Sequence, residues 1–334
     1  TGNTAVGSVA LVANTTGANN TAVGLSALTA NTTGAENTAS GKQSLAANTT
    51  GANNTAHGSR ALGSNTTASN NTAVGRDALL TNTTGSENTA LGTDALKAST
   101  TAANNVAVGY YSAQANTTGT ANVSLGAYSF YTNTTGSNNT ALGQNSLAAN
   151  TTGENNVAVG TLALDANTTA SNNVAVGYGT LGVNTTGAGN TALGHQALEK
   201  NTTASNNTAV GLNSLFKNTT GAANTAYGKG SMQACTTGDD NTAIGLNALA
   251  ANTTGTQNAA VGYTALTANT TGYRNTAVGT LAGDLTTTGH SNITIGYASD
   301  SSSNSAAGQC TLGNSDISNL RCNDQSISAL SDSR

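Results

Sequence analysis

Few residues of this chain carry side chains that could take part in acid–base or nucleophilic chemistry. Among 334 residues there are 14 aspartates and glutamates, 10 lysines and arginines, three histidines and three cysteines. Glu36, Glu87 and Glu154 precede equivalent asparagines of a repeating pattern, but several repeats separate them, which is too far for a catalytic carboxylate pair. We therefore expect solvated surface charges, no enzymatic activity and no bound cofactor.

The aspartates are equally scattered along the chain. Asp77, Asp94 and Asp165 are expected to be solvated and to form no ladder from one repeat to the next. The pair Asp239-Asp240 could offer oxygen ligands to a calcium ion, but the glycine-rich pattern of calcium-binding β-rolls is absent. We therefore expect no metal site.

The cysteines do not indicate a metal site either. Cys235, Cys310 and Cys322 share no spacing typical of metal ligands. Cys310 and Cys322 could form a disulfide, or they could be free thiols that pack as small hydrophobic side chains. The sequence leaves both alternatives open.

Aromatic residues gather in one short part of the chain. Tyr110, Tyr111, Tyr128 and Tyr131 lie in two consecutive repeats, together with Phe130. Aromatic rings favour contact with sugar rings, so the four tyrosines are candidate surface contacts for a glycan or protein of a host cell surface. In the alternative interpretation the rings fill a widened core or a seam between chains, and this alternative is favoured for Phe130.

The scaffold that must position these residues is a tandem repeat with a period of 17 residues and no insertion. Asparagine opens each of 18 units and glycine follows at the fifth position, with the pattern Asn-Thr-Ala-Val-Gly-x-x-Ala-Leu-x-x-Asn-Thr-Thr-Gly-x-x. Such spacing opposes a helix and favours short β-strands bounded by turns. The units begin at residues 3, 20, 37, 54, 71, 88, 105, 122, 139, 156, 173, 190, 207, 224, 241, 258, 275 and 292.

Strict absence of insertions predicts an all-β solenoid (a β-roll or β-helix) in which each repeat forms one coil and equivalent positions stack as ladders. We expect two short strands in each coil, at Thr-Ala-Val and at Ala-Leu, with turns at the fifth-position glycine and at Asn-Thr-Thr-Gly. Representative ladder residues in two coils are Asn20, Val23, Gly24, Leu28, Asn71, Val74, Gly75 and Leu79.

The strand pattern also predicts an oligomer. Successive side chains of a strand point to opposite faces, so the third-position alanine and the fourth-position valine cannot both enter one interior. An aliphatic stripe along a thin rod exceeds what monomers normally expose, which predicts a parallel, in-register homotrimeric fibre. Ser40, His57 and Tyr227 replace the fourth-position aliphatic residue and are expected to be local defects that the ladder tolerates.

Composition excludes several classes of protein. Only 7% of residues are charged, and the net charge of −4 leaves no basic stripe for nucleic acid. No apolar run is long enough to span a membrane, so membrane insertion is not expected. A disordered chain would be richer in proline and charge and would not place its apolar residues at fixed intervals.

The Asn-Thr-Ala-Val-Gly core, as in residues 20–24 and 71–75, resembles the head repeats of YadA-type trimeric autotransporter adhesins. The resemblance covers residues 1–296 and implies a trimeric left-handed β-roll. The family repeat is usually shorter than 17 residues, and the additional residues are expected to enlarge the Asn-Thr-Thr-Gly turn.

Residues 297–334 resemble a different family. The runs 311–314, 317–322 and 327–334 are similar to the segment that precedes the intramolecular chaperone domain of bacteriophage tail fibres and endosialidase-type tailspikes. In that family the chaperone assists trimer assembly and then cuts itself off at a Ser-Asp junction, which implies a processing junction at Ser331 and Asp332. The chaperone body and its lysine are not in this chain, and a plain polar C-terminus is the alternative.

Together these features predict a solenoid at 1–296 and a capping or trimerising segment at 297–334 that leads to a chaperone domain. The expected function is that of an extracellular structural segment of a virion tail fibre that supports host attachment. The alternative is the head or stalk of a trimeric autotransporter adhesin on a bacterial cell surface. A weaker alternative is an ice- or glycan-binding solenoid, because threonine pairs such as Thr15-Thr16 recur, although adjacent threonines point in opposite directions.

Overall fold

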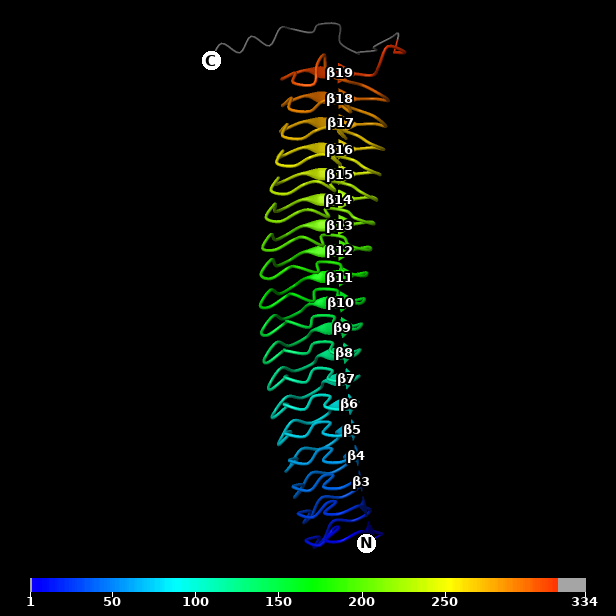
Figure 1. Ribbon diagram of the computed structural model, residues 1–334, viewed down its shortest axis with the longest axis vertical. Coiled ribbons are helices and arrows are strands. Elements are labelled where there is room, and N and C mark those ends of the chain that lie inside the picture. Colours follow the sequence, from blue (N-terminus) through cyan, green and yellow to red (C-terminus); the bar gives the residue numbers. More distant parts are fainter. Residues whose placement is uncertain (1, 318–334) are drawn as a thin grey trace, which may run out of the picture.

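The computed structural model describes residues 2–317, so the predictions for Cys322, Ser331 and Asp332 concern residues outside the described part. The described residues form a slender, slightly bowed rod in which one coil is stacked on the next from the N-terminal to the C-terminal end (Figure 1). The fold is an all-β solenoid of about 18 coils with a 17-residue period, as the repeat predicts.

Each coil contributes one three-residue strand to a single parallel sheet that runs the length of the rod (Figure 1). Every strand pairs with the next in register, for example Thr21 with Thr38 and Ala22 with Ala39. The strands are β1 Thr4–Val6, β2 Thr21–Val23, β3 Thr38–Ser40, β4 Thr55–His57, β5 Thr72–Val74, β6 Thr89–Leu91, β7 Val106–Val108, β8 Val123–Leu125, β9 Thr140–Leu142, β10 Val157–Val159, β11 Val174–Val176, β12 Thr191–Leu193, β13 Thr208–Val210, β14 Thr225–Tyr227, β15 Thr242–Ile244, β16 Ala259–Val261, β17 Thr276–Val278, β18 Ile293–Ile295 and β19 Cys310–Leu312.

The strand of each coil places alanine inside and its neighbours outside. Ala22 is fully buried, whereas Val23 beside it is 39% exposed. The interior is completed by the eighth-position and ninth-position side chains, such as Ala27 and Leu28, which are both fully buried. The expectation that the third and fourth positions face opposite sides is confirmed.

The second strand expected at Ala-Leu does not form. Ala27 and Leu28 are both buried, and consecutive side chains of a strand cannot both point inward. Leu28 instead has a left-handed backbone with φ 50°, and Leu79 has φ 51°. This conformation costs an L-residue roughly 1–2 kcal/mol. Burial of a leucine side chain contributes roughly 1.5–3 kcal/mol, which offsets that cost.

Glycine at the fifth position is required by both conformation and space. Gly75 has φ 133°, and a Cβ atom there would lie 2.5 Å from the carbonyl oxygen of Gly92 in the next coil. The fifteenth position is less demanding in conformation, because Gly85 has no positive φ and alanine replaces this glycine at Ala68 and Ala102 in the adjacent coils. A Cβ atom on Gly85 would lie 2.0 Å from the carbonyl oxygen of Ala102, so alanine there requires a shift of the neighbouring backbone. Glycine is therefore invariant at the fifth position because the positive φ and the close approach of the next coil's backbone both exclude a side chain.

Two ladders of buried asparagines hold consecutive coils in register. At the first position, Asn71 Oδ1 accepts a hydrogen bond from the backbone N–H of Asn88 at 2.9 Å, and Asn71 Nδ2 donates to the Gly85 carbonyl at 3.0 Å. At the twelfth position, Asn65 Nδ2 donates to Asn48 Oδ1 of the coil before at 2.8 Å. Because these amides are buried, a slip of one residue would leave them unpaired.

The twelfth-position ladder is interrupted in three of the first 17 coils. In each of them another residue replaces asparagine and does not donate a hydrogen bond to the amide oxygen of the asparagine one coil before. The replacing residues are Ser99, Cys235 and Thr286. The amide oxygens left buried without a hydrogen-bond partner are those of Asn82, Asn218 and Asn269.

The 17-residue spacing is kept through the last described strand. β19 pairs with β18 in register, with Cys310 opposite Ile293. The backbone N–H of Gln309 donates to Asn292 Oδ1 at 3.0 Å, so the first-position ladder also continues. The parallel sheet thus extends beyond residue 296.

Candidate functional site

Side-chain variety is concentrated at the sixth, seventh and tenth positions of each coil, which follow the strand. We call this column of positions the variable face. The seventh position has a left-handed backbone in most coils, for example φ 59° at Asp77 and 57° at Tyr111. Ion pairs and ring contacts join side chains of these positions from consecutive coils, so they lie side by side along the rod.

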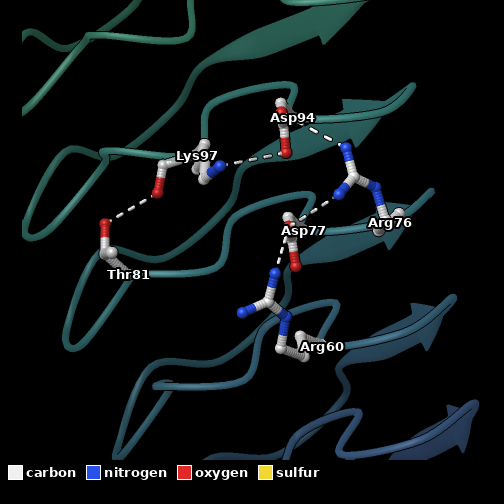
Figure 2. A network of polar contacts seen from close by, with 6 residues as sticks. All are labelled: Arg60, Arg76, Asp77, Thr81, Asp94 and Lys97. Carbon is white, nitrogen blue, oxygen red and sulfur yellow. Dashed lines mark hydrogen bonds and ion pairs between the residues drawn. The ribbon is translucent and has the colours of Figure 1, made fainter.

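A network of charged side chains occupies the variable face between residues 60 and 97 (Figure 2). Arg60 Nη2 contacts Asp77 Oδ2 at 2.5 Å, and Arg76 lies 3.8 Å from both Asp77 and Asp94. Lys97 Nζ lies 3.3 Å from Asp94 Oδ1. Each carboxylate therefore has two cationic neighbours, and Arg76 bridges the two coils.

The expectation that Asp77 and Asp94 are solvated and form no ladder is wrong. Their side chains are 1% and 2% exposed, and they occupy the seventh position of adjacent coils. The cationic side chains of neighbouring positions cover them and neutralise two carboxylates that would otherwise repel each other. The signal in the sequence was Arg60, which lies one period before Asp77. Glu36, Glu87 and Glu154 are exposed, as expected.

The four candidate tyrosines form one cluster on the variable face, directly after the charged network. Tyr111 and Tyr128 are stacked, with centroids 5.6 Å apart and an angle of 8° between planes. Tyr110 packs edge-on against Tyr111 at 4.1 Å, and Tyr131 packs edge-on against Tyr128 at 5.6 Å. Tyr110 and Tyr128 are exposed, so the cluster presents rings to the solvent.

Phe130 does not belong to this cluster. It is fully buried at the ninth position, above the small Ala113 of the preceding coil, so a large and a small residue share the interior. The buried hydroxyls of Ser112 and Ser124 lie 2.7 Å apart, and Ser124 is also hydrogen-bonded to Ser129. This polar interior supports the two coils that carry the tyrosines.

A surface pocket of about 210 Å³ lies further along the variable face. It opens where Gly179 and Gly182 leave the seventh and tenth positions of one coil without side chains. Asp165 and Glu199 line it from the coils before and after, and Asp165 is half-buried there, not fully solvated as expected. Sequence reasoning missed the pocket, although two glycines at variable positions of one coil were a visible signal.

An exposed aliphatic stripe follows the outward face of the strands, at the fourth position. Leu91, Ile244 and Val278 are all more than 40% exposed. His57 and Tyr227, which interrupt the stripe, are exposed as well. The described chain alone therefore leaves this column of apolar side chains open to solvent.

The two threonines of a Thr-Thr pair have different surroundings. Thr32 Oγ1 donates to the Thr49 carbonyl of the next coil at 3.0 Å, whereas Thr33 is exposed. The same donation joins Thr49 to Thr66. In these two pairs only the second threonine is exposed, which limits a regular threonine array to a single column, although Thr15 and Thr16 of the first coil are both exposed.

The two described cysteines have different environments. Cys235 is a buried free thiol, and burial raises its pKa to about 11. Cys310 is exposed and has no disulfide partner among the described residues, and the partner considered for it, Cys322, lies outside them. The processing junction at Ser331 and Asp332 also lies outside them.

Comparison with known proteins finds no family model and no curated protein that matches this chain. Within residues 2–317 there is no helix that could cross a lipid bilayer. The same part of the chain contains no group of three or more histidine, cysteine, aspartate or glutamate side chains arranged to hold a metal ion. The rod, its aliphatic stripe and its variable face are therefore the features of the described chain on which a function can be based.

Proposed function

We propose that this chain is a structural segment of an extracellular bacteriophage tail fibre that supports host attachment and has no enzymatic role. The observation that carries the proposal is the uninterrupted stack of 17-residue coils, which joins every strand from β1 to β19 in one hydrogen-bonded sheet. Such a stack resists bending and stretching because each coil is bonded to the next along the whole rod. A stiff spacer of this kind holds a binding tip away from a particle.

The exposed aliphatic stripe supports assembly into a parallel homotrimer. Two further copies of the chain would cover the stripe, and in-register packing would place equivalent side chains of the three copies at the same height. The residues that interrupt the stripe would then also lie together, with three copies of His57 at one height and three copies of Tyr227 at another. A shifted register would place these polar groups against aliphatic residues, at a cost of desolvation.

The tyrosine cluster is the candidate contact surface for a glycan or protein of the host. Its rings are held against one another and two of them are exposed, so contact with a sugar ring would require little ordering of side chains. The cluster also lies on the variable face, where substitutions do not interrupt the ladders.

The attachment role is tested by replacing cluster residues with residues that other coils use at the same positions. The change Tyr110→Thr copies the sixth position of the coil before, and Tyr111→Asn copies a seventh position found at Asn145. Fibres with both changes should be trimeric but should attach to host cells more weakly. The control is Tyr263→Thr, which removes an exposed sixth-position tyrosine outside the cluster. Attachment unaffected by the double change would remove these tyrosines as contacts.

The alternative is a segment of a trimeric adhesin anchored to a bacterial cell, which would use the same solenoid. The sequence that follows Arg334 in the source gene distinguishes the two. An autoproteolytic chaperone domain there is expected for a tail fibre, whereas a coiled coil with a membrane barrel would assign the chain to an adhesin.

A further inference from the structure

The pocket at residues 162–199 is formed by the absence of two side chains. Gly179 and Gly182 occupy the seventh and tenth positions, and full side chains occupy those positions in the coils on both sides. A Cβ atom on Gly182 would lie 3.5 Å from Asp165 Oδ1, so this carboxylate borders the empty space directly. A Cβ atom on Gly179 would lie 3.8 Å from Cγ of Gln196 on the other side.

One of the two carboxylates that line the pocket has no cation beside it in the described chain. Asp165 has no ion-pair partner among the described residues. Burial raises its pKa, and the nearby charge of Glu199 raises it further. Glu199 Oε1 contacts Lys200 Nζ at 2.5 Å, but Glu199 Oε2 is buried without a hydrogen-bond partner. By contrast, Asp77 and Asp94 on the same face each have two cationic neighbours.

An aromatic ring lies at the mouth of the pocket. Tyr178 is 50% exposed and lines the opening, and its ring is stacked on that of His195 with centroids 5.4 Å apart. The stacking fixes the ring in place. An aromatic face beside carboxylates attracts a cation through both its quadrupole and the neighbouring charges.

We propose that this pocket binds a small organic cation, an ammonium or guanidinium group, between Asp165 and Glu199 and against Tyr178. The pocket volume of about 210 Å³ is below the range of drug-sized sites, which limits the occupant to one small group. The cation supplies the positive charge that Asp165 lacks and a hydrogen-bond donor for Glu199 Oε2. The inference rests on the proposed function only for its biological role, in which the group belongs to a host surface.

Calorimetric titration of the assembled chain at low salt tests the proposal, with propylguanidinium and glucosamine as probes. Glucosamine carries its ammonium on a sugar ring, whereas propylguanidinium resembles the end of an arginine side chain. Saturable binding of either probe at one site per chain is the expected result, and the tighter probe indicates whether an amino sugar or a basic side chain is the source. N-acetylglucosamine, which has the ring without the charge, should not bind.

Three variants locate the binding. Asp165→Asn removes the unpaired charge and should weaken binding at least about tenfold. The double change Gly179→Asn and Gly182→Ala should abolish binding, because both residues occur at these positions in other coils and fill the pocket without disturbing the fold. Glu154→Gln removes an exposed carboxylate outside the pocket and should leave binding unchanged.

Three results would overturn the inference. They are the absence of saturable binding by both cations, equal binding of N-acetylglucosamine, and binding that Asp165→Asn leaves intact. Host attachment by the same preparation separates this result from the proposed function. Fibres that attach to host cells but take up no cation would refute the cation site alone.

Discussion

Replacing Ser99 with asparagine should make the solenoid more stable, because it completes the twelfth-position ladder. Ser99 Oγ and Asn82 Oδ1 are both buried without a hydrogen-bond partner. Asn116 Nδ2, one coil further on, donates to the Gly119 carbonyl and lacks the acceptor that it would find in a complete ladder. An asparagine at residue 99 would donate to Asn82 and accept from Asn116.

The magnitude follows from the bonds gained. Each of the two new amide hydrogen bonds contributes roughly 1 kcal/mol net. Satisfying the buried oxygen of Asn82 removes a further penalty of roughly 1–3 kcal/mol. Ordering the asparagine side chain opposes these terms by an amount on the order of 1 kcal/mol. We therefore expect a gain of about 2–4 kcal/mol in local free energy of unfolding, with no steric cost, since the coils before and after already hold asparagine there.

Native-state hydrogen exchange is the appropriate assay, because repeat proteins can open locally and a single melting temperature can miss the effect. Amide protection in the coils around residue 99 should increase in the Ser99→Asn variant. Ser59→Asn, the same change at an exposed sixth position, should leave protection unchanged. Unchanged or lower protection around residue 99, in a chain that keeps its β-structure, would refute the role given to the asparagine ladder.

Three further outcomes are expected. Gly75→Ala should destabilise the rod by about 3 kcal/mol, because it combines an unfavourable φ with a clash. Gly85→Ala should cost less, because it adds a clash but no unfavourable φ and the adjacent coils accommodate alanine there; denaturant unfolding compares the two. Arg60→Gln should lower the free energy of unfolding by about 1–3 kcal/mol, because it removes a cation beside the buried carboxylate of Asp77. This cost should be smaller in a chain that also carries Asp77→Asn, and equal costs in both backgrounds would contradict the ion pair. The thiol of Cys235 should resist alkylation at pH 8 in the folded chain, because its pKa of about 11 keeps it protonated and burial blocks the reagent, and it should react after unfolding; mass spectrometry measures both states, and rapid labelling of the folded chain would contradict its burial.

The period of the repeat was sufficient to predict the solenoid, because identical spacing without insertion allows only stacked coils. The outward direction of the Val23 side chain could be predicted from strand alternation, because the side chain of its neighbour Ala22 points into the interior. The conformation of Leu28 could not be predicted in the same way, since its left-handed φ depends on the need to bury two consecutive side chains. A short apolar pair bounded by turn residues predicts a strand for such a leucine.

The variable face was the least predictable part, because its features arise between coils and not within one. Asp77 appears solvated when its own repeat is considered, and its burial becomes evident only when Arg60 is placed one period away. The pocket likewise depends on Gly182 and on the carboxylate of Asp165 in the coil before. The tyrosines were found because their residue type is rare in this chain and their spacing brings them into adjacent coils.

The molar mass of the chain in solution tests the proposed fibre most directly. Light scattering at micromolar concentration should give three times the chain mass of 32.5 kDa. Val261→Asp, which places a charge in the aliphatic stripe, should reduce the assembly, and Leu246→Asp, an equally exposed change on the variable face, should not. A monodisperse species of one chain mass, with its coils intact, would contradict the trimeric fibre.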